Sequence, residues 1–213
     1  MKKNIGVVLA GGSGVRFGSS LPKQYQQINQ KDVIGYVIDA FRESASIDDV
    51  FVVAHHDYIS YVNEKFQIDT IAGGDNRNIT VYNALQHICS NFPDCENVVF
   101  ADSARPLLKP NVLDDICELL NENDAVITTA KITDSLGYKD NSLVDRNDYY
   151  LVQTPEAFRI ECLKGFKPDS DATAIIQQST CRNVYHYDKM LYNLKITYPD
   201  DLIIAKALLE VIK

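Results

Sequence analysis

Short apolar runs alternate along the chain with segments whose apolar residues recur at helical spacing. The runs at residues 5–9, 50–54, 68–72, 98–101 and 125–130 predict strands, the first of them buried on both faces. Helical periodicity at residues 33–41, 79–88 and 112–120 predicts helices, and residues 199–212 predict a last helix whose start carries a proline and two aspartates. This alternation predicts an α/β fold with a mostly parallel twisted sheet that helices cover.

One segment, residues 131–152, breaks the alternation. It has no clean helical period and is rich in charged and amide side chains, so we expect a β-arm or an extended hairpin there. A projecting arm in a small domain often serves dimerisation, and the alternative is a plain surface loop. With 213 residues and no repeat or linker-like stretch, the chain predicts a single domain over residues 1–213, with residues 131–152 as its arm.

Charge and composition exclude several classes of protein. Lysine and arginine number 21 against 29 aspartates and glutamates, which gives a net charge of −8. Nucleic-acid and anionic-membrane binding usually need a basic face, so we expect neither partner, although a small basic pocket for a phosphorylated metabolite stays possible. No apolar run approaches the roughly 18 residues of a membrane span, and the apolar stretch after the basic N-terminus is too short for a signal peptide. We therefore expect a cytoplasmic protein.

Cysteine and histidine spacing gives no familiar metal site. The five cysteines are widely spaced, and no two form a C-x-x-C pair, so we expect buried thiols in a reducing cytosol. The four histidines include the neighbours His55 and His56, and none lies in an H-E-x-x-H or similar pattern.

The strongest local signal follows the first predicted strand, where residues 9–18 contain four glycines. Glycines allow positive φ angles and let backbone N–H groups approach an anion closely. The dinucleotide fingerprint fails because Phe17 stands where it needs glycine, and the P-loop pattern fails from each glycine of the turn. Arg16 and Lys23 add two cations, so we expect a polyphosphate site. The alternative is a tight strand–helix turn with two solvated cations.

Polar residues also follow two later predicted strands. Residues 73–77 carry a glycine pair and an arginine, and Thr80 follows on the next predicted helix. Asp102 comes directly after the strand at residues 98–101, at the edge where such sheets bind ligands, and a carboxylate there could hold Mg²⁺ or a ligand hydroxyl. Arg105 could meet a phosphate, or it could simply pair with Asp102.

Two further clusters lie late in the chain. One combines Asp145 and Arg146 with Gln153-Thr154-Pro155, and the other is residues 193–197, in which Lys195 lies in a short β-like run. Taken singly, either cluster is no more than an ordinary group of polar residues on a protein surface.

Taken in order, these segments resemble the cytidylyltransferases that act on polyol phosphates. The shared elements are a glycine-rich turn with an arginine, then P-K-Q, G-G-x-x-R, D-x-x-R-P, D-R with Q-T-P, and N-[IL]-K-[IV]-T. Here they occupy residues 10–16, 22–24, 73–77, 102–106, 145–155 and 193–197. One branch of the family makes the CDP derivative of 2-C-methyl-D-erythritol 4-phosphate for isoprenoid synthesis. The other makes CDP-ribitol or similar compounds for teichoic acid or capsule.

The resemblance implies a Rossmann-like nucleotidyltransferase fold, a homodimer formed through the arm, Mg²⁺ and CTP. It implies that Arg16, Lys23 and Lys195 hold the triphosphate and catalyse the reaction. Implied nucleotide-binding residues are Leu9, Ala10, Gly11, Gly12, Ser13, Gly14, Gly73, Gly74, Asp75, Arg77 and Thr80. Implied acceptor-binding residues are Asp102, Arg105, Arg146, Thr154 and Ser170, with Asp102 also the candidate metal ligand and with Arg146 and Thr154 offered across the dimer.

Such a reaction needs positioning and charge neutralisation more than a general base, because the attacking phosphate is already an anion. The absence of an obvious catalytic histidine therefore fits the resemblance. Departures from the family pattern bear on the acceptor: Ala101 stands where a histidine is usual, and Asp32 and Tyr36 replace a common proline and histidine.

The identity of the acceptor stays open between the two branches. Three motifs favour the ribitol branch: the turn at residues 9–12, Ser170-Asp171-Ala172 and Leu191-Tyr192-Asn193. The short length of the chain favours the methylerythritol branch. We expect ribitol 5-phosphate or a similar polyol phosphate, with 2-C-methyl-D-erythritol 4-phosphate as the alternative. Two rival functions are a catalytically silent nucleotide-binding domain and a sugar-1-phosphate nucleotidyltransferase that uses another base.

Overall fold

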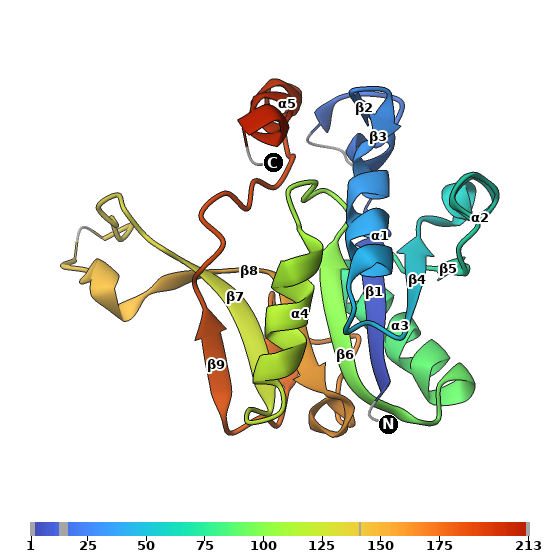
Figure 1. Ribbon diagram of the computed structural model, residues 1–213. Helices are drawn as coiled ribbons and strands as arrows, with labels where there is room; N and C mark the ends of the chain where they lie inside the picture. Colours follow the sequence, from blue (N-terminus) through green and yellow to red (C-terminus); the bar gives the residue numbers. More distant parts are fainter. Residues whose placement is uncertain (1–2, 13–16, 141, 212–213) are drawn as a thin grey trace.

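The computed structural model describes residues 3–12, 17–140 and 142–211, which are built around a seven-stranded sheet (Figure 1). The strands lie in the order β5-β4-β1-β6-β8-β7-β9. Their bounds are Lys3–Ala10 for β1, Asp49–Ala54 for β4, Thr70–Ala72 for β5, Cys95–Asp102 for β6, Ala125–Lys131 for β7, Tyr150–Arg159 for β8 and Val184–Tyr187 for β9. Strands β2 (Gln27–Ile28) and β3 (Lys31–Asp32) form a separate small hairpin.

Most of the sheet is parallel, as the alternation of strands and helices predicts. Strand β1 pairs in parallel with β4 and β6, β4 with β5, and β7 with β9. Strand β8 is antiparallel to both of its neighbours, β6 and β7. Sequence patterning did not predict β8 or β9, because the first residues of β8 are exposed and β9 buries only its last residue.

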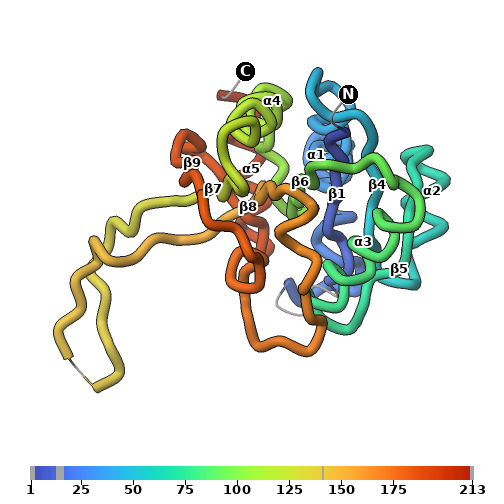
Figure 2. Tube along the Cα trace, turned by 90° about the horizontal axis from the view of Figure 1, so that it is seen from below, coloured from blue at the N-terminus to red at the C-terminus, as the bar shows by residue number. Residues whose placement is uncertain are grey.

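Alternate residues of the central strands face two different layers. Val8 of β1 packs in a core with α1 (Val33–Glu43), α2 (Ile59–Phe66) and α4 (Pro110–Leu119). Val7 packs in a second core with α3 (Arg77–Asn91), and Figure 2 shows α3 on the opposite side of the strands from α1 and α4. Both valines are fully buried, which explains why β1 reads as a continuous apolar run.

A third small core lies at the carboxyl edge of the sheet. It joins the β2–β3 hairpin to the C-terminal helix α5 (Asp201–Val211), near the top of Figure 1. Asp201 fixes the segment that leads into α5, because its Oδ2 accepts hydrogen bonds from the backbone N–H groups of Thr197 and Tyr198 at 2.7 and 2.8 Å. Lys195 lies before this helix in a segment without regular secondary structure, so the β-like run expected there is wrong.

The arm leaves the sheet between β7 and β8. Pairing from Thr128↔Gln153 to Lys131↔Tyr150 forms its base, and the rest projects away from the body of the protein (Figures 1 and 2). The expected extended hairpin is thus paired only at its base; further out, the described chain has one short 3₁₀ turn, Arg146–Asp148. Several large apolar side chains of the arm face solvent: Tyr138, Leu143, Tyr149, Tyr150, Leu151 and Val152.

The structure holds all five cysteines as free thiols, as expected from their spacing. Three of them are buried, but Cys89 is exposed and Cys181 is half-buried, so the expectation of buried thiols is wrong for these two. Burial raises the pKa of the Cys95 and Cys117 thiols to about 12, which keeps them protonated and unreactive. Among the described residues, no helix combines the length and the apolar character that crossing a membrane requires.

Candidate active site

A cavity of about 560 Å³ opens at the carboxyl edge of the sheet. Because parallel strands end at the same edge, segments far apart in sequence meet there. Its lining residues are Leu9, Gly11, Gly12, Phe17, Lys23, Gln24, His55, His56, Gly73, Gly74, Asp75, Asn76, Arg77, Thr80, Asp102, Ser103, Ala104, Lys195 and Thr197. Five of the six segments singled out in the sequence therefore contribute residues to one space. Of the residues expected there, Ser13, Gly14 and Arg16 lie outside the described part of the chain.

Two glycine-rich turns touch each other beside Thr80. A Cβ atom on Gly11 would lie 2.9 Å from Thr80 Oγ1, and one on Gly73 would lie 3.1 Å from the same atom. Thr80 Oγ1 donates a hydrogen bond to Asn76 O at 2.8 Å and accepts one from Gly74 N at 3.1 Å. The Thr80 hydroxyl, which is expected to bind the nucleotide, therefore also holds the second turn in shape.

Close packing, more than a positive φ, requires glycine in the first turn. Among the described glycines only Gly18 has a positive φ, +73°. Gly11 is needed for the contact with Thr80, whereas a Cβ on Gly12 would meet nothing within 4 Å. Gly11 and Gly12 thus do not use the positive φ that glycine allows.

Gln24 fixes the first glycine-rich turn, a role that sequence analysis missed. It lies in the 3₁₀ turn Lys23–Tyr25 and is only 2% exposed. Its Nε2 donates hydrogen bonds to Ala10 O at 3.0 Å and to Gly12 O at 2.8 Å. The turn and Lys23 are thereby held at a fixed distance from each other.

Asp102 and Lys195 form an ion pair in the cavity, with Nζ 2.7 Å from Oδ2. Arg105 Nε lies 3.7 Å from the same oxygen. Burial alone would raise the pKa of the Asp102 carboxyl, but the charges of Lys195, Arg77 and Arg105 outweigh burial and hold that pKa below its usual value. Asp102 is therefore a carboxylate at neutral pH, and Lys195 is fixed by it despite lying outside the strands.

A second ion pair lies under the cavity wall. Arg77 Nη2 is 2.8 Å from Oε2 of Glu156, whose side chain is 1% exposed. Burial raises the pKa of the Glu156 carboxyl, although Arg77 opposes the shift. Sequence analysis missed Glu156; the only local signal is a charged residue directly before the apolar pair at residues 157–158. The pair holds Arg77, which faces the cavity, against strand β8.

Thr154 and Arg105 support the cavity from below and do not line it. Thr154 is 3% exposed, and its Oγ1 accepts a hydrogen bond from the backbone N–H of Asp102 at 3.0 Å. Arg105 is 8% exposed and donates to Asn193 O, while Asn193 Nδ2 donates to Thr154 O at 2.9 Å. In its own chain the Thr154 hydroxyl thus contacts the end of the strand that carries Asp102, and its role across a dimer stays a prediction.

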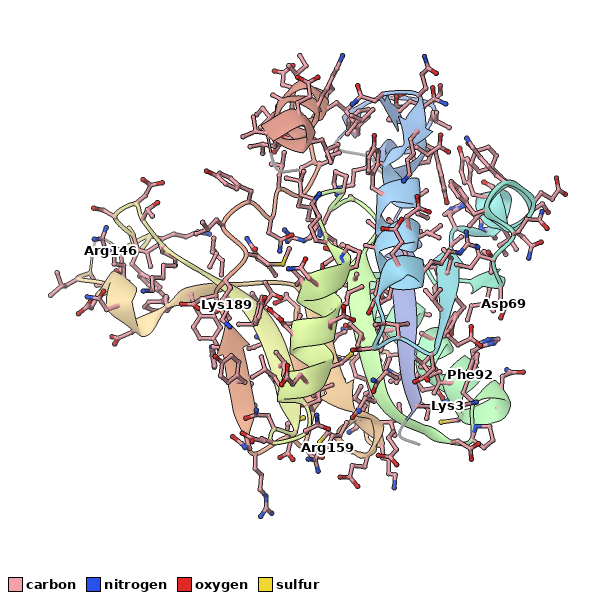
Figure 3. All side chains as sticks on the ribbon, viewed as in Figure 1. Lys3, Asp69, Phe92, Arg146, Arg159 and Lys189 are labelled. Atoms are coloured by element: carbon pink, nitrogen blue, oxygen red, sulfur yellow. The ribbon has the colours of Figure 1, made fainter. Side chains whose placement is uncertain are left out.

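Two other expected acceptor residues lie away from the cavity of their own chain. Ser170 O accepts a hydrogen bond from Asn78 Nδ2 at 2.6 Å, which ties its loop to α3, but Ser170 is not part of the lining. Arg146 lies on the arm, away from the sheet, where it donates to Thr133 O (Figure 3). Arg146 could serve a cavity only in a second copy of the chain.

The acidic residues of the cavity fit a magnesium ion that is shared with a phosphate ligand. Mg²⁺ is usually held by one or two carboxylates, substrate phosphates and waters. The lining contains two carboxylates, Asp75 and Asp102. Asp102 is ionised and gives only one oxygen to Lys195, so its second oxygen suits such an ion.

Comparison with known proteins gives a family and a fold. The model of the family described as "IspD: 2-C-methyl-D-erythritol 4-phosphate cytidylyltransferase" matches residues 5–211. The chain is 31% identical over 231 residues to the 2-C-methyl-D-erythritol 4-phosphate cytidylyltransferase of Clostridium botulinum strain 657 / Type Ba4, covering 99% of each chain. It is 27% identical over 228 residues to the ribitol-5-phosphate cytidylyltransferase of Streptococcus agalactiae serotype Ia, covering 97% of this chain and 95% of the relative.

A solved structure confirms the predicted nucleotidyltransferase fold. The 4-diphosphocytidyl-2C-methyl-D-erythritol synthase of Anaerococcus prevotii superposes with a TM-score of 0.82 and covers 98% of this chain. The alignment covers 96% of that structure at 23% identity, so it speaks for the fold alone.

Proposed function

Because the chain belongs to the 2-C-methyl-D-erythritol 4-phosphate cytidylyltransferase family, we propose that it transfers CMP from CTP to the phosphate of 2-C-methyl-D-erythritol 4-phosphate. Members of this family are CTP-dependent nucleotidyltransferases, and this chain is an enzyme of that class. The observation that carries the proposal is the meeting of Lys23, Asp102 and Lys195 with two glycine-rich turns around one cavity. That arrangement suits a nucleoside triphosphate and a second phosphate.

Sequence similarity favours the methylerythritol acceptor over the ribitol acceptor, which reverses the preference drawn from short motifs. The relative that uses 2-C-methyl-D-erythritol 4-phosphate is 31% identical, against 27% for the ribitol-5-phosphate relative. Of the motifs that favour ribitol, those at residues 170–172 and 191–193 carry less weight, because neither segment lines the cavity. Ribitol 5-phosphate remains the second acceptor to test.

In the proposed reaction, an oxygen of the acceptor phosphate attacks the α-phosphorus of CTP. The bond between that phosphorus and the oxygen that bridges to the β-phosphate breaks, and pyrophosphate leaves with the electron pair. Lys23 and Lys195 supply fixed positive charge in the cavity, where negative charge grows on the α-phosphate and the leaving group. The resemblance implies that Arg16 also holds the triphosphate, so we include it in this set of cations.

Asp102 has two tasks in this scheme. It fixes Lys195 through the 2.7 Å ion pair, and it offers an oxygen to the Mg²⁺ that the family implies. When bound, the ion would neutralise part of the triphosphate charge. The hydrogen bond from Asp102 N to Thr154 holds the strand end that presents the carboxylate.

The exposed apolar residues of the arm support a homodimer. Leu143 is fully exposed and Tyr138 is 61% exposed. Large apolar side chains grouped in this way usually mark a surface that another protein surface covers. In such a dimer the partner's arm would bring its Arg146 to the acceptor end of the cavity. A cytoplasmic location fits the five free thiols and the need for CTP.

Pyrophosphate release tests the function directly. The full chain is assayed with Mg²⁺ and CTP against 2-C-methyl-D-erythritol 4-phosphate and ribitol 5-phosphate in separate reactions, with ATP, GTP and UTP as nucleotide controls. We expect the highest kcat/KM with CTP and the methylerythritol compound. A higher value with ribitol 5-phosphate would restore the ribitol assignment, and equal rates with UTP would contradict the cytidylyl assignment.

A further inference from the structure

Two histidines and an aspartate meet at the mouth of the cavity, where the proposed reaction does not use them. His55 follows β4 directly and precedes the 3₁₀ turn His56–Tyr58. His55 and His56 both line the cavity, and their rings stack with centroids 4.2 Å apart. Asp57 follows in the same turn and turns its carboxylate back toward both rings.

The distances match those between the ligands of one metal ion. Asp57 Oδ1 lies 3.1 Å from His56 Nε2, and Asp57 Oδ2 lies 3.5 Å from His55 Nδ1. One donor atom from each of the three residues lies within 4.8 Å of the others. Ligands at roughly 2.0–2.2 Å from a tetrahedral ion are themselves roughly 3.4 Å apart, so the two contacts of Asp57 already have about this spacing.

The donor set selects the class of ion. Two imidazoles and one carboxylate suit Zn²⁺, Ni²⁺ or Co²⁺, whereas Mg²⁺ prefers a shell of oxygens. The three side chains are accessible, with 28%, 75% and 65% of the side chains of His55, His56 and Asp57 exposed. This separates the site from the Mg²⁺ expected at Asp102, which sits deeper and has no imidazole ligand.

We propose that His55, His56 and Asp57 bind one divalent transition-metal ion at the mouth of the cavity. Three protein ligands leave at least one coordination position open. Because both histidines line the cavity, an open position would face the space that Lys23 and Gly74 also line. An anionic ligand atom, such as a phosphate oxygen, could occupy it. The proposal does not depend on which acceptor the enzyme uses.

Calorimetric titration of the untagged full chain with Ni²⁺ tests the site. We expect one ion per chain, and we expect His56→Ala and Asp57→Ala each to weaken the affinity by about tenfold or more, the loss typical of disturbed metal shells. Both side chains are mostly exposed, so both variants should fold normally. His186→Ala is the matched control, since His186 is an exposed histidine on β9 outside the cluster.

Asp102→Asn and a cysteine-blocked sample exclude the other metal-binding groups of the chain. The proposal predicts that both retain the wild-type affinity for Ni²⁺. Unchanged binding in His56→Ala and Asp57→Ala would overturn it, as would the absence of a saturable site in the wild-type chain. Loss of binding confined to Asp102→Asn or to the cysteine-blocked sample would also overturn it, because the ion would then sit elsewhere.

Discussion

Lys23 enters the cavity beside the turn that Gln24 holds in place. A fixed cation at that point stabilises the charge that develops as pyrophosphate leaves, and losing one such group commonly lowers turnover by about a hundredfold or more. We therefore expect Lys23→Ala to lower the single-turnover rate by about that factor, measured with saturating CTP. The exposed Lys167, outside the cavity, provides the control variant Lys167→Ala. A near-wild-type rate for Lys23→Ala would remove Lys23 from the mechanism.

The Asp102–Lys195 pair makes a prediction about pH. Because the pKa of the folded-state Asp102 carboxyl is lowered, its ionisation stabilises the native state above the unfolded-state pKa, and this contribution is lost as pH falls through the folded-state pKa. The variant Lys195→Met removes the positive charge that does most to offset the effect of burial on Asp102, so the pKa of the Asp102 carboxyl rises. The variant should then lose about 1–2 kcal/mol of unfolding free energy at neutral pH, a value reduced for the 39% exposure of Lys195.

Urea unfolding at several pH values measures this loss. The difference between the wild type and Lys195→Met should shrink as pH falls through and below the ordinary range of an aspartate pKa, because Asp102 is protonated first in the variant and last in the wild type, whose folded-state pKa is lowered. Lys195→Arg keeps the charge and should recover most of the stability at neutral pH. A difference that stays constant with pH would show that the pair contributes through packing alone.

Gly11 allows a test of the contact between the two turns. A methyl group at this position would lie 2.9 Å from Thr80 Oγ1, and overpacking of this kind costs about 1–3 kcal/mol. We expect Gly11→Ala to lower the unfolding free energy by that amount. Gly12→Ala is the matched control, since its Cβ would meet nothing within 4 Å and should have almost no effect. In the double variant Gly11→Ala, Thr80→Ala, the two losses should not add.

At the scale of elements, sequence patterning succeeds where burial is complete. Strand β1 is apolar because both of its faces are covered, and the run at residues 5–9 shows this directly. Helix α2 was not predicted, since Val62 is its only buried residue and leaves no apolar period. Strand β9 escaped prediction for the same reason.

The sequence predicted most of the residues that line the site, but not the buried residues that hold them in place. Gly73 and Asp102 could be found from the sequence, because the ends of parallel strands gather at one edge. Lys23 could be found because it is a cation that follows the glycine-rich turn. Glu156 could not be found from the sequence, because its role is to pair with Arg77, which lies 79 positions away in the chain. Gln24 was visible in P-K-Q, but only the folded backbone shows that it holds Ala10 and Gly12.

The exposed apolar side chains of the arm allow a prediction about dimerisation. If its exposed apolar side chains are covered in a dimer, a buried charge there should be costly. We expect Leu143→Asp to weaken dimerisation at least tenfold, as measured by analytical ultracentrifugation across a range of concentrations. Leu191→Asp changes another leucine that is 85% exposed but lies outside the arm, and it should leave the dimer intact. Equal self-association of both variants would show that Leu143 lies outside the interface.

At the scale of the whole molecule, the position of Arg146 decides whether one chain is a complete enzyme. The arm carries Arg146 away from the cavity of its own subunit (Figure 3). An acceptor role for Arg146 therefore requires a second copy. Arg146→Ala should raise the KM for the acceptor and leave the affinity for CTP almost unchanged, because the nucleotide end of the cavity belongs to one subunit.

Mixed dimers test this sharing of sites. Co-expression of Lys23→Ala and Arg146→Ala chains gives heterodimers in which one cavity has both defects and the other has neither, provided that Arg146 acts on its partner. With random pairing in a two-fold dimer, about a quarter of the cavities should then be intact, and about a quarter of wild-type activity should return. If Arg146 served its own chain, every cavity in the mixture would lack one of the two residues. Activity no higher than that of the separate variants would then contradict the exchange of arms between subunits.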